Sequence, residues 1–265
     1  MKIRSKPIRT LFILIVFLAV QPCFSEGSPR VLATNSWTAA YAAAAGVEGV
    51  EILAPADMVH PPEYELLPSD VKKVHDADFL IYAGYEVLMK TVFESFEKPE
   101  DELIRIQTGY NPELMRRSIL AVAGRTGNRA EALRSIDEIE AFFRDTREAL
   151  RQKGIFGVRV LVHFHQRPLA EALGFEIAGV FGPAPMEVGQ LRKLGSLEPL
   201  FIIDNAHNPI AVPLAEITGA PAAELINFPG LYNDKEAGNF MSLIGVLTHN
   251  RNILLADEFL LRIKS

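Results

Sequence analysis

The side chains best suited to chemistry in this sequence are histidines and carboxylates that follow apolar runs. His163 and His165 stand two residues apart at the end of the apolar run Val158–Val162. Residues two apart on an extended strand point to the same face, so both imidazoles would reach a common ion. Neutral imidazole suits zinc and other late divalent ions, and carboxylates add charge and suit manganese or iron. The spacing therefore predicts a site for a divalent cation.

Other polar side chains follow other apolar runs in the same way. Ligands of open α/β sheets bind beyond the carboxyl ends of the strands, and this rule selects the residues in the loops after those ends. Besides the two histidines above, the candidates are His60, Tyr110, Asn111, Glu113, Asp204, Asn205, His207 and Asn227. We expect them to lie around one cleft.

The elements that would position these residues alternate between short apolar runs and helical stretches. The predicted strands are Val50–Leu53, Asp78–Ala83, Leu103–Ile106, Val158–Val162, Ile177–Val180, Leu200–Ile203 and Glu224–Ile226. Such alternation is typical of βαβ units around a mostly parallel sheet. We therefore predict an α/β fold with two Rossmann-like lobes, over residues 26–127 and 154–265.

One long helix is predicted between the lobes, over residues 128–153. This stretch contains neither glycine nor proline, and its apolar residues, among them Ile136 and Phe143, recur at helical spacing. Asn128 is expected to cap its start and Gly154 to end it. At 1.5 Å per residue the helix would be about 39 Å long, enough to brace both lobes rigidly.

Composition indicates a folded protein with an export signal. The chain has 265 residues, 49% of them hydrophobic and 23% charged, and a formal net charge of −6. Residues 1–25 combine basic residues with the short apolar run Leu11–Val20 and are predicted to be a signal peptide cleaved after Ser25. Cleavage would remove Cys23, the only cysteine, and leave an acidic chain unsuited to nucleic acid. A periplasmic location is expected.

Several segments resemble one family. The runs His60–Val71 and Asp76–Gly84 are similar to the corresponding segments of the periplasmic metal-binding proteins of zinc and manganese ABC importers, the ZnuA/TroA-like family. Asn111-Pro112-Glu113 resembles the family's Asp-Pro-His, and Ala215–Ala220 resembles its Ala-Glu-x-x-Gly-Ala. The resemblance implies two lobes joined by a rigid helix, a divalent metal as transported ligand, and a membrane ABC permease as partner of a monomeric protein.

The ligand positions that the resemblance implies are largely changed here. The first ligand falls on Pro62, with His60 two residues earlier, and the second falls on Glu113. The third is kept at His163, with His165 nearby, and the fourth falls on Asn227.

Two outcomes follow for the site. In the first, His60, Glu113 and His163 hold a divalent ion such as zinc or manganese, and His165, Asp204 or Asn227 completes the set. In the second, the cleft takes a metal chelate or an organic solute through hydrogen bonds from Glu113, Tyr110 and Asn227.

Catalysis has little support in the sequence. A metal-dependent hydrolase is the enzymatic alternative, because His163-Phe164-His165 is similar to the His-x-His strand end of amidohydrolases. That motif opens an eight-stranded barrel of about 250 residues, and far fewer residues follow His165. We therefore predict a solute-binding protein that captures a divalent cation for an ABC permease, and not an enzyme.

Overall fold

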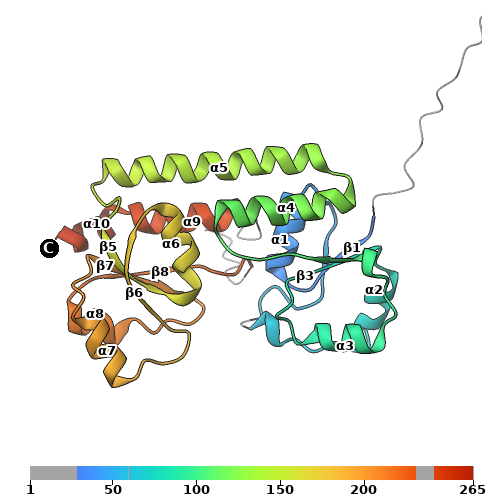
Figure 1. Cartoon of the computed structure of the whole chain (residues 1–265), viewed down its shortest axis with the longest axis horizontal. Coiled ribbons are helices and arrows are strands. Elements are labelled where there is room, and N and C mark those ends of the chain that lie inside the picture. Colours follow the sequence, from blue (N-terminus) through green and yellow to red (C-terminus); the bar gives the residue numbers. More distant parts are fainter. Residues whose placement is uncertain (1–28, 59, 231–241, 265) are drawn as a thin grey trace, which may run out of the picture.

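The computed structural model describes residues 29–58, 60–230 and 242–264. They form two α/β lobes side by side, each with a four-stranded sheet whose paired strands are all parallel (Figure 1). The predicted fold class is thus confirmed. The predicted signal peptide, residues 1–25, lies outside the described residues.

The N-terminal lobe is built on a sheet with strand order β2-β1-β3-β4. Its strands are β1 (Val31–Ala33), β2 (Glu51–Ile52), β3 (Phe79–Tyr82) and β4 (Leu103–Arg105). Its helices are α1 (Ser36–Ala44), α2 (Asp70–Asp76), α3 (Leu88–Ser95) and α4 (Pro112–Thr126), with short 3₁₀ turns η1 (Pro61–Glu63) and η2 (Glu100–Glu102). The central strand β1 was missed by the sequence analysis, because a three-residue apolar run gives almost no periodicity.

The C-terminal lobe repeats the plan with strand order β6-β5-β7-β8. Its strands are β5 (Arg159–His163), β6 (Glu176–Phe181), β7 (Phe201–Asn205) and β8 (Ala222–Leu225). Its helices are α6 (Arg167–Leu173), α7 (Val188–Gly195), α8 (Val212–Thr218), α9 (Leu243–Leu255) and α10 (Asp257–Lys264), with the 3₁₀ turn η3 (Phe164–Gln166) after β5.

Helix α5 (Arg129–Gln152) runs along both lobes. Its 24 residues make it about 36 Å long. Its apolar residues, including Ile136 and Phe143, are buried as the helical spacing predicts. The predicted cap is wrong: the side chain of Asn128 makes no capping bond and instead donates from Nδ2 to the carbonyl oxygen of Gly46 (2.9 Å). Asn128 thus ties the start of α5 to the end of α1.

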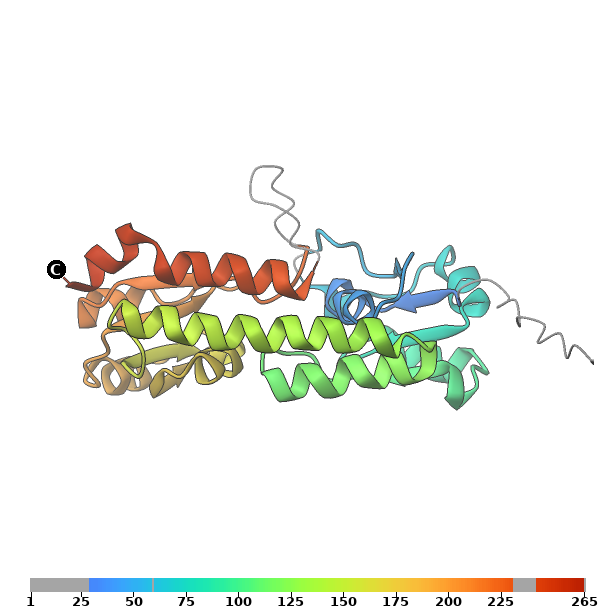
Figure 2. The ribbon, with the colours of Figure 1, turned by 90° about the horizontal axis from the view of Figure 1, so that it is seen from above.

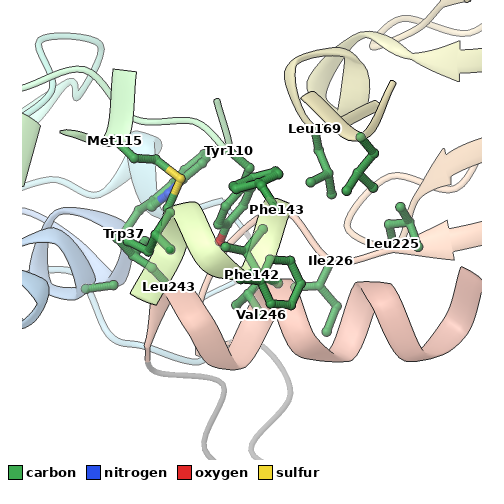
Figure 3. Packing of buried hydrophobic residues seen from close by; sticks show 14 of the residues in the cluster. Trp37, Tyr110, Met115, Phe142, Phe143, Leu169, Leu225, Ile226, Leu243 and Val246 are labelled. Carbon is green, nitrogen blue, oxygen red and sulfur yellow. The ribbon is translucent and has the colours of Figure 1, made fainter. Parts of the chain in front are cut away.

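The two lobes share one hydrophobic core. Figure 2 shows α9 beside the half of α5 that covers the C-terminal lobe, and α4 beside the other half. Side chains from α1, α5 and α9 meet in a single cluster that contains Trp37, Phe143 and Leu243 and continues into the C-terminal sheet (Figure 3). This shared core holds the lobes at a fixed separation, and the loops at the facing sheet ends border the space between them.

In the described part of the chain, no helix has both the length and the apolar character needed to cross a membrane.

Candidate functional site

A cleft of about 770 Å³ lies between the lobes, where loops from both sheets meet. The N-terminal lobe lines it with Trp37, His60, Pro61, Pro62, Tyr85, Thr108 and Gly109. The C-terminal lobe lines it with Phe164, His165, Arg167, Pro168, Glu171, Pro183, Asn205, His207, Asn208, Asn227 and Phe228. Most of these residues follow the carboxyl ends of strands, as expected for the ligand-binding edge of parallel sheets.

Aromatic rings join the two lobes beside this cleft. Trp37 stacks on Tyr110 at 5.6 Å between ring centroids and meets the ring of Phe228 edge-on at 4.8 Å. Trp37 and Tyr110 are both buried. Trp37 also lines the cleft.

The C-terminal lobe places His165 through a buried glutamine. Strand β5 ends at His163 and η3 carries the chain through His165 to Gln166. The Gln166 Nε2 group donates to Asn205 Oδ1 (3.2 Å) and to the carbonyl oxygen of Leu225 (2.8 Å). These bonds tie η3 to the ends of β7 and β8, so the loop that presents His165 is anchored to the sheet.

Two further cleft residues are positioned by backbone hydrogen bonds. The backbone N–H of Asn227 donates to His207 Nδ1 (3.3 Å). Asn250 in α9 bonds both the N–H and the carbonyl of Ile226, at 2.8 and 2.9 Å, and so fixes the segment just before Asn227. Because His207 Nδ1 accepts a hydrogen bond, the neutral ring carries its proton on Nε2 and has no open lone pair for a metal in this arrangement.

The N-terminal lobe holds its loops through a buried carboxylate. Glu86 Oε1 accepts from the hydroxyl of Thr34 (2.7 Å) and from the N–H of Ala83 (2.9 Å), and Oε2 accepts from the N–H of Gly84 (2.7 Å). Nearby, Tyr41 donates its hydroxyl to the carbonyl of Gly109 (2.6 Å), which fixes a backbone segment that lines the cleft.

The cleft histidines in the C-terminal lobe are neutral at pH 7. Burial lowers the pKa of His165 below its usual value of 6.5. Burial lowers the pKa of His207 to about 4, and repulsion from charge on His165 and His60 adds to the shift. Neutral imidazole is the form that binds metals. His60 of the N-terminal lobe lines the same cleft as these two histidines.

Of the six metal ligands predicted from the sequence, three line the cleft: His60, His165 and Asn227. The side-chain Oδ1 of Asn227 is buried and has no hydrogen-bond partner among the described residues. His165 offers an imidazole and Asn227 an amide oxygen from one lobe, and His60 offers an imidazole from the other. These are ligand atoms that a late divalent ion accepts.

His163 lies outside the lining. Strand β5 ends at His163 and the chain turns into η3, and the ring centroids of His163 and His165 lie 5.3 Å apart, so the two imidazoles are neighbours as their spacing predicts. His163 has no exposed surface, and its ring packs edge-on against Phe181. Its Nδ1 accepts the backbone N–H of His165 (3.2 Å), and burial lowers its pKa to about 4. Its Nε2 is buried and has no hydrogen-bond partner among the described residues.

Glu113 and Asp204 also lie outside the lining. Glu113 is an exposed residue in the first turn of α4. The Asp204 carboxylate accepts the backbone N–H groups of Asn205, Ile210 and Ala211 at 2.8 to 2.9 Å. Burial raises the pKa of Asp204, and these hydrogen bonds oppose the rise. Its oxygens therefore hold the loop after β7.

Within residues 29–58, 60–230 and 242–264, no three His, Cys, Asp or Glu side chains lie close enough together to hold one metal ion.

The sequence analysis expected His207 at the cleft but not among the metal ligands, and it did not single out five other cleft residues, Tyr85, Phe164, Arg167, Glu171 and Phe228. Phe164 lies between the two histidines of the His-x-His motif, so this motif could have identified it as a cleft residue. The other four carry no motif.

Comparisons with known proteins show which solved structures share this fold. A scan against models of protein families and a search of curated proteins found no match. Among solved structures, the solute-binding protein FpvC of Pseudomonas aeruginosa with Ni²⁺ is 17% identical with a TM-score of 0.68, covering 90% of this chain and 97% of its own. The laminin-binding protein Lmb of Streptococcus agalactiae, titled an adhesin with metal-transporting activity, is 15% identical with a TM-score of 0.63, covering 86% and 98%. AdcAII of Streptococcus pneumoniae is 13% identical with a TM-score of 0.65, at the same coverage.

These structures show that the chain has the two-lobe fold of this group of solute-binding proteins along most of its length. The fold that the sequence resemblance implied is therefore confirmed.

Proposed function

We propose that this protein is an extracytoplasmic solute-binding protein that captures a divalent metal ion, such as zinc or manganese, in the cleft between its lobes. It delivers the ion to a membrane ABC permease and carries out no reaction on it. The observation that carries the proposal is the approach of imidazoles from both lobes, His60 on one side and His165 on the other, to one cleft. Structures with the same fold hold Ni²⁺ and Mn²⁺.

The way the lobes are joined supports binding and release of a small solute. Helix α5 and the shared core connect the lobes over a broad contact, so a wide hinge movement would break buried packing. Capture and release would then depend on small movements of the loops around the cleft, including η1, which begins after His60, and η3.

The metal content of the exported protein tests the proposal. The protein is purified without added metal or chelator, and its content of transition elements is measured. This measurement detects the ion whether or not a small molecule accompanies it. We expect about one bound transition metal per chain in the wild type. When His60 and His165 are both replaced by alanine, the metal content should fall at least tenfold, because the loss of two ligands lowers the affinity by more than tenfold, or about 1.4 kcal/mol.

His75→Ala is the matched control, because its imidazole is 82% exposed and stands on α2, away from the cleft lining. Its metal content should equal that of the wild type. Equal metal content in the wild type and in the double variant would contradict capture at this site.

A further inference from the structure

We propose, as an extension of the metal-binding function above, that the ion occupies the cleft as a chelate, already held by a small organic ligand with anionic oxygen donors. Imidazoles of the cleft would fill the coordination positions that the chelator leaves open. The size, the charge and the surface chemistry of the cleft each point to such a ligand.

The cleft is much larger than an ion requires. Its volume is about 770 Å³. One water molecule takes up about 30 Å³ of liquid, so an ion with a few bound waters would fill only a small part of this space. Pockets of about 300–1,000 Å³ are typical of sites for organic ligands and cofactors. The volume therefore fits a metal together with a chelator.

The charge of the lining is unsuited to a bare divalent cation. Among the described residues that line the cleft, Glu171 is the only carboxylate, and its Oε1 is 2.7 Å from Nε of Arg167. The buried carboxylates of Glu86 and Asp204, outside the lining, already accept hydrogen bonds from backbone N–H and hydroxyl groups. A dipositive ion placed among neutral imidazoles and amides would keep its charge uncompensated, which is costly in a partly buried site. A chelator with carboxylate-type donors supplies the missing negative charge itself.

The surface chemistry of the cleft fits organic carbon. Most of the remaining lining is aromatic or proline, including Tyr85, Phe164 and Phe228. Phe164 and Tyr85, one from each lobe, stay 53% and 45% exposed. Aromatic rings at a cleft bind the carbon frame of a ligand through burial and ring contacts. A hydrated ion would make no use of them.

The ligating atoms match a metal whose coordination sphere is nearly complete. The described residues assemble no cluster of three His, Cys, Asp or Glu, so those that line the cleft offer an ion few protein ligands. His60 and His165 face the cleft from opposite lobes and can each supply one imidazole nitrogen. One or two imidazoles are what a partly chelated ion still requires.

The test compares four probes by calorimetry with the whole exported chain freed of bound metal. They are Ni²⁺ with nitrilotriacetate, which leaves positions open for imidazole; Ni²⁺ with EDTA, which closes the coordination sphere; Ni²⁺ alone; and nitrilotriacetate alone. We expect the nitrilotriacetate complex to bind one per chain and at least about tenfold more tightly than Ni²⁺ alone, a difference of about 1.4 kcal/mol. The EDTA complex and the free chelator should bind far more weakly.

Two pairs of variants locate the binding. His165→Ala should weaken the nitrilotriacetate complex at least tenfold, and His75→Ala should leave it unchanged. Phe164→Ala should weaken the complex about threefold and leave Ni²⁺ alone unaffected, because the ring contacts the chelator. Phe93→Ala is its control, since Phe93 is 56% exposed and lies on α3 outside the cleft lining. The exposed positions of Phe164 and Phe93 make both replacements compatible with folding.

The outcomes separate the two proposals. If Ni²⁺ alone binds as tightly as its nitrilotriacetate complex and His165→Ala weakens both equally, the chelate is excluded and the metal-binding function stands. If no metal form binds and the purified protein carries no metal, both proposals are overturned.

Discussion

Gly182 lies against the imidazole of His163 so closely that a Cβ added to Gly182 would fall 2.5 Å from Nε2 of that ring. Gly182 also has a φ of +71°, a backbone conformation that strains residues with a side chain. Gly182→Ala should therefore lower the free energy of unfolding by about 1–3 kcal/mol, from steric overlap and backbone strain together. Urea unfolding measures the change.

The matched control for this prediction is Gly189→Ala. Gly189 is in α7, and an added Cβ would meet no atom within 4 Å. The control should be neutral or stabilising by up to about 1 kcal/mol, because alanine favours a helix. Equal effects of the two substitutions would contradict the close packing of Gly182 on His163.

The buried state of His163 predicts a loss of stability in mild acid. Burial lowers its pKa in the folded protein to about 4 from 6.5, so between these values the unfolded chain binds the proton more readily. Stability is therefore fully present above pH 6.5 and falls as the pH drops toward 4. At pH 5 the loss from this residue should be about 2 kcal/mol, and protonation of Nδ1 would also break its bond from the His165 N–H.

Urea unfolding at pH 7.5 and 5 checks this prediction with wild type and His163→Gln. His207 has its pKa lowered to about 4 by burial and contributes a similar loss that stays in the variant. The variant should therefore show a pH dependence smaller by about 2 kcal/mol, whatever its absolute stability. An unchanged pH dependence would mean that His163 is not held neutral by the fold.

Glu86 should be essential for the loops of the N-terminal lobe. Its buried carboxylate accepts hydrogen bonds from Thr34, Ala83 and Gly84. Glu86→Ala leaves the N–H groups of Ala83 and Gly84 without these acceptors and should cost about 2–4 kcal/mol of unfolding free energy. Glu86→Gln should cost less, because one oxygen remains as an acceptor while the new amide faces a backbone N–H. Glu94→Gln on exposed α3 serves as the control, and a cost for Glu86→Ala no larger than that of Glu94→Gln would contradict the bonding.

The sequence predicted the fold well because buried parallel strands are read as continuous apolar runs. Strand β5 is an example, with Val160, Leu161 and Val162 fully buried. Helix α5 was equally clear as a helix, because its 24 residues carry a regular apolar face. Strand β1 was not predicted, since a three-residue strand at the centre of a sheet is defined by the strands it pairs with and not by its own sequence pattern.

The candidate site was predicted in part. His165 and Asn227 reached the cleft because residues that follow the carboxyl ends of parallel strands gather at one edge. His163 was expected beside His165, and their ring centroids do lie 5.3 Å apart, but His163 is fully buried and does not line the cleft. Asp204 does not line the cleft for another reason. Three backbone N–H groups donate to its carboxylate, a tertiary arrangement that residue spacing does not reveal.

The shared core predicts that the lobes unfold together. Phe143 on α5 is 1% exposed and belongs to the cluster that includes Trp37 of the N-terminal lobe and Phe201 of the C-terminal lobe. Phe143→Ala should cost about 3–5 kcal/mol, as expected for an aromatic ring removed from a packed core. Leu133→Ala, at a 37% exposed position on the same helix, should cost much less. Calorimetry should show a single transition for the wild type and both variants, because one continuous core joins the lobes. Two resolved transitions in the wild type would show that the lobes are stabilised independently.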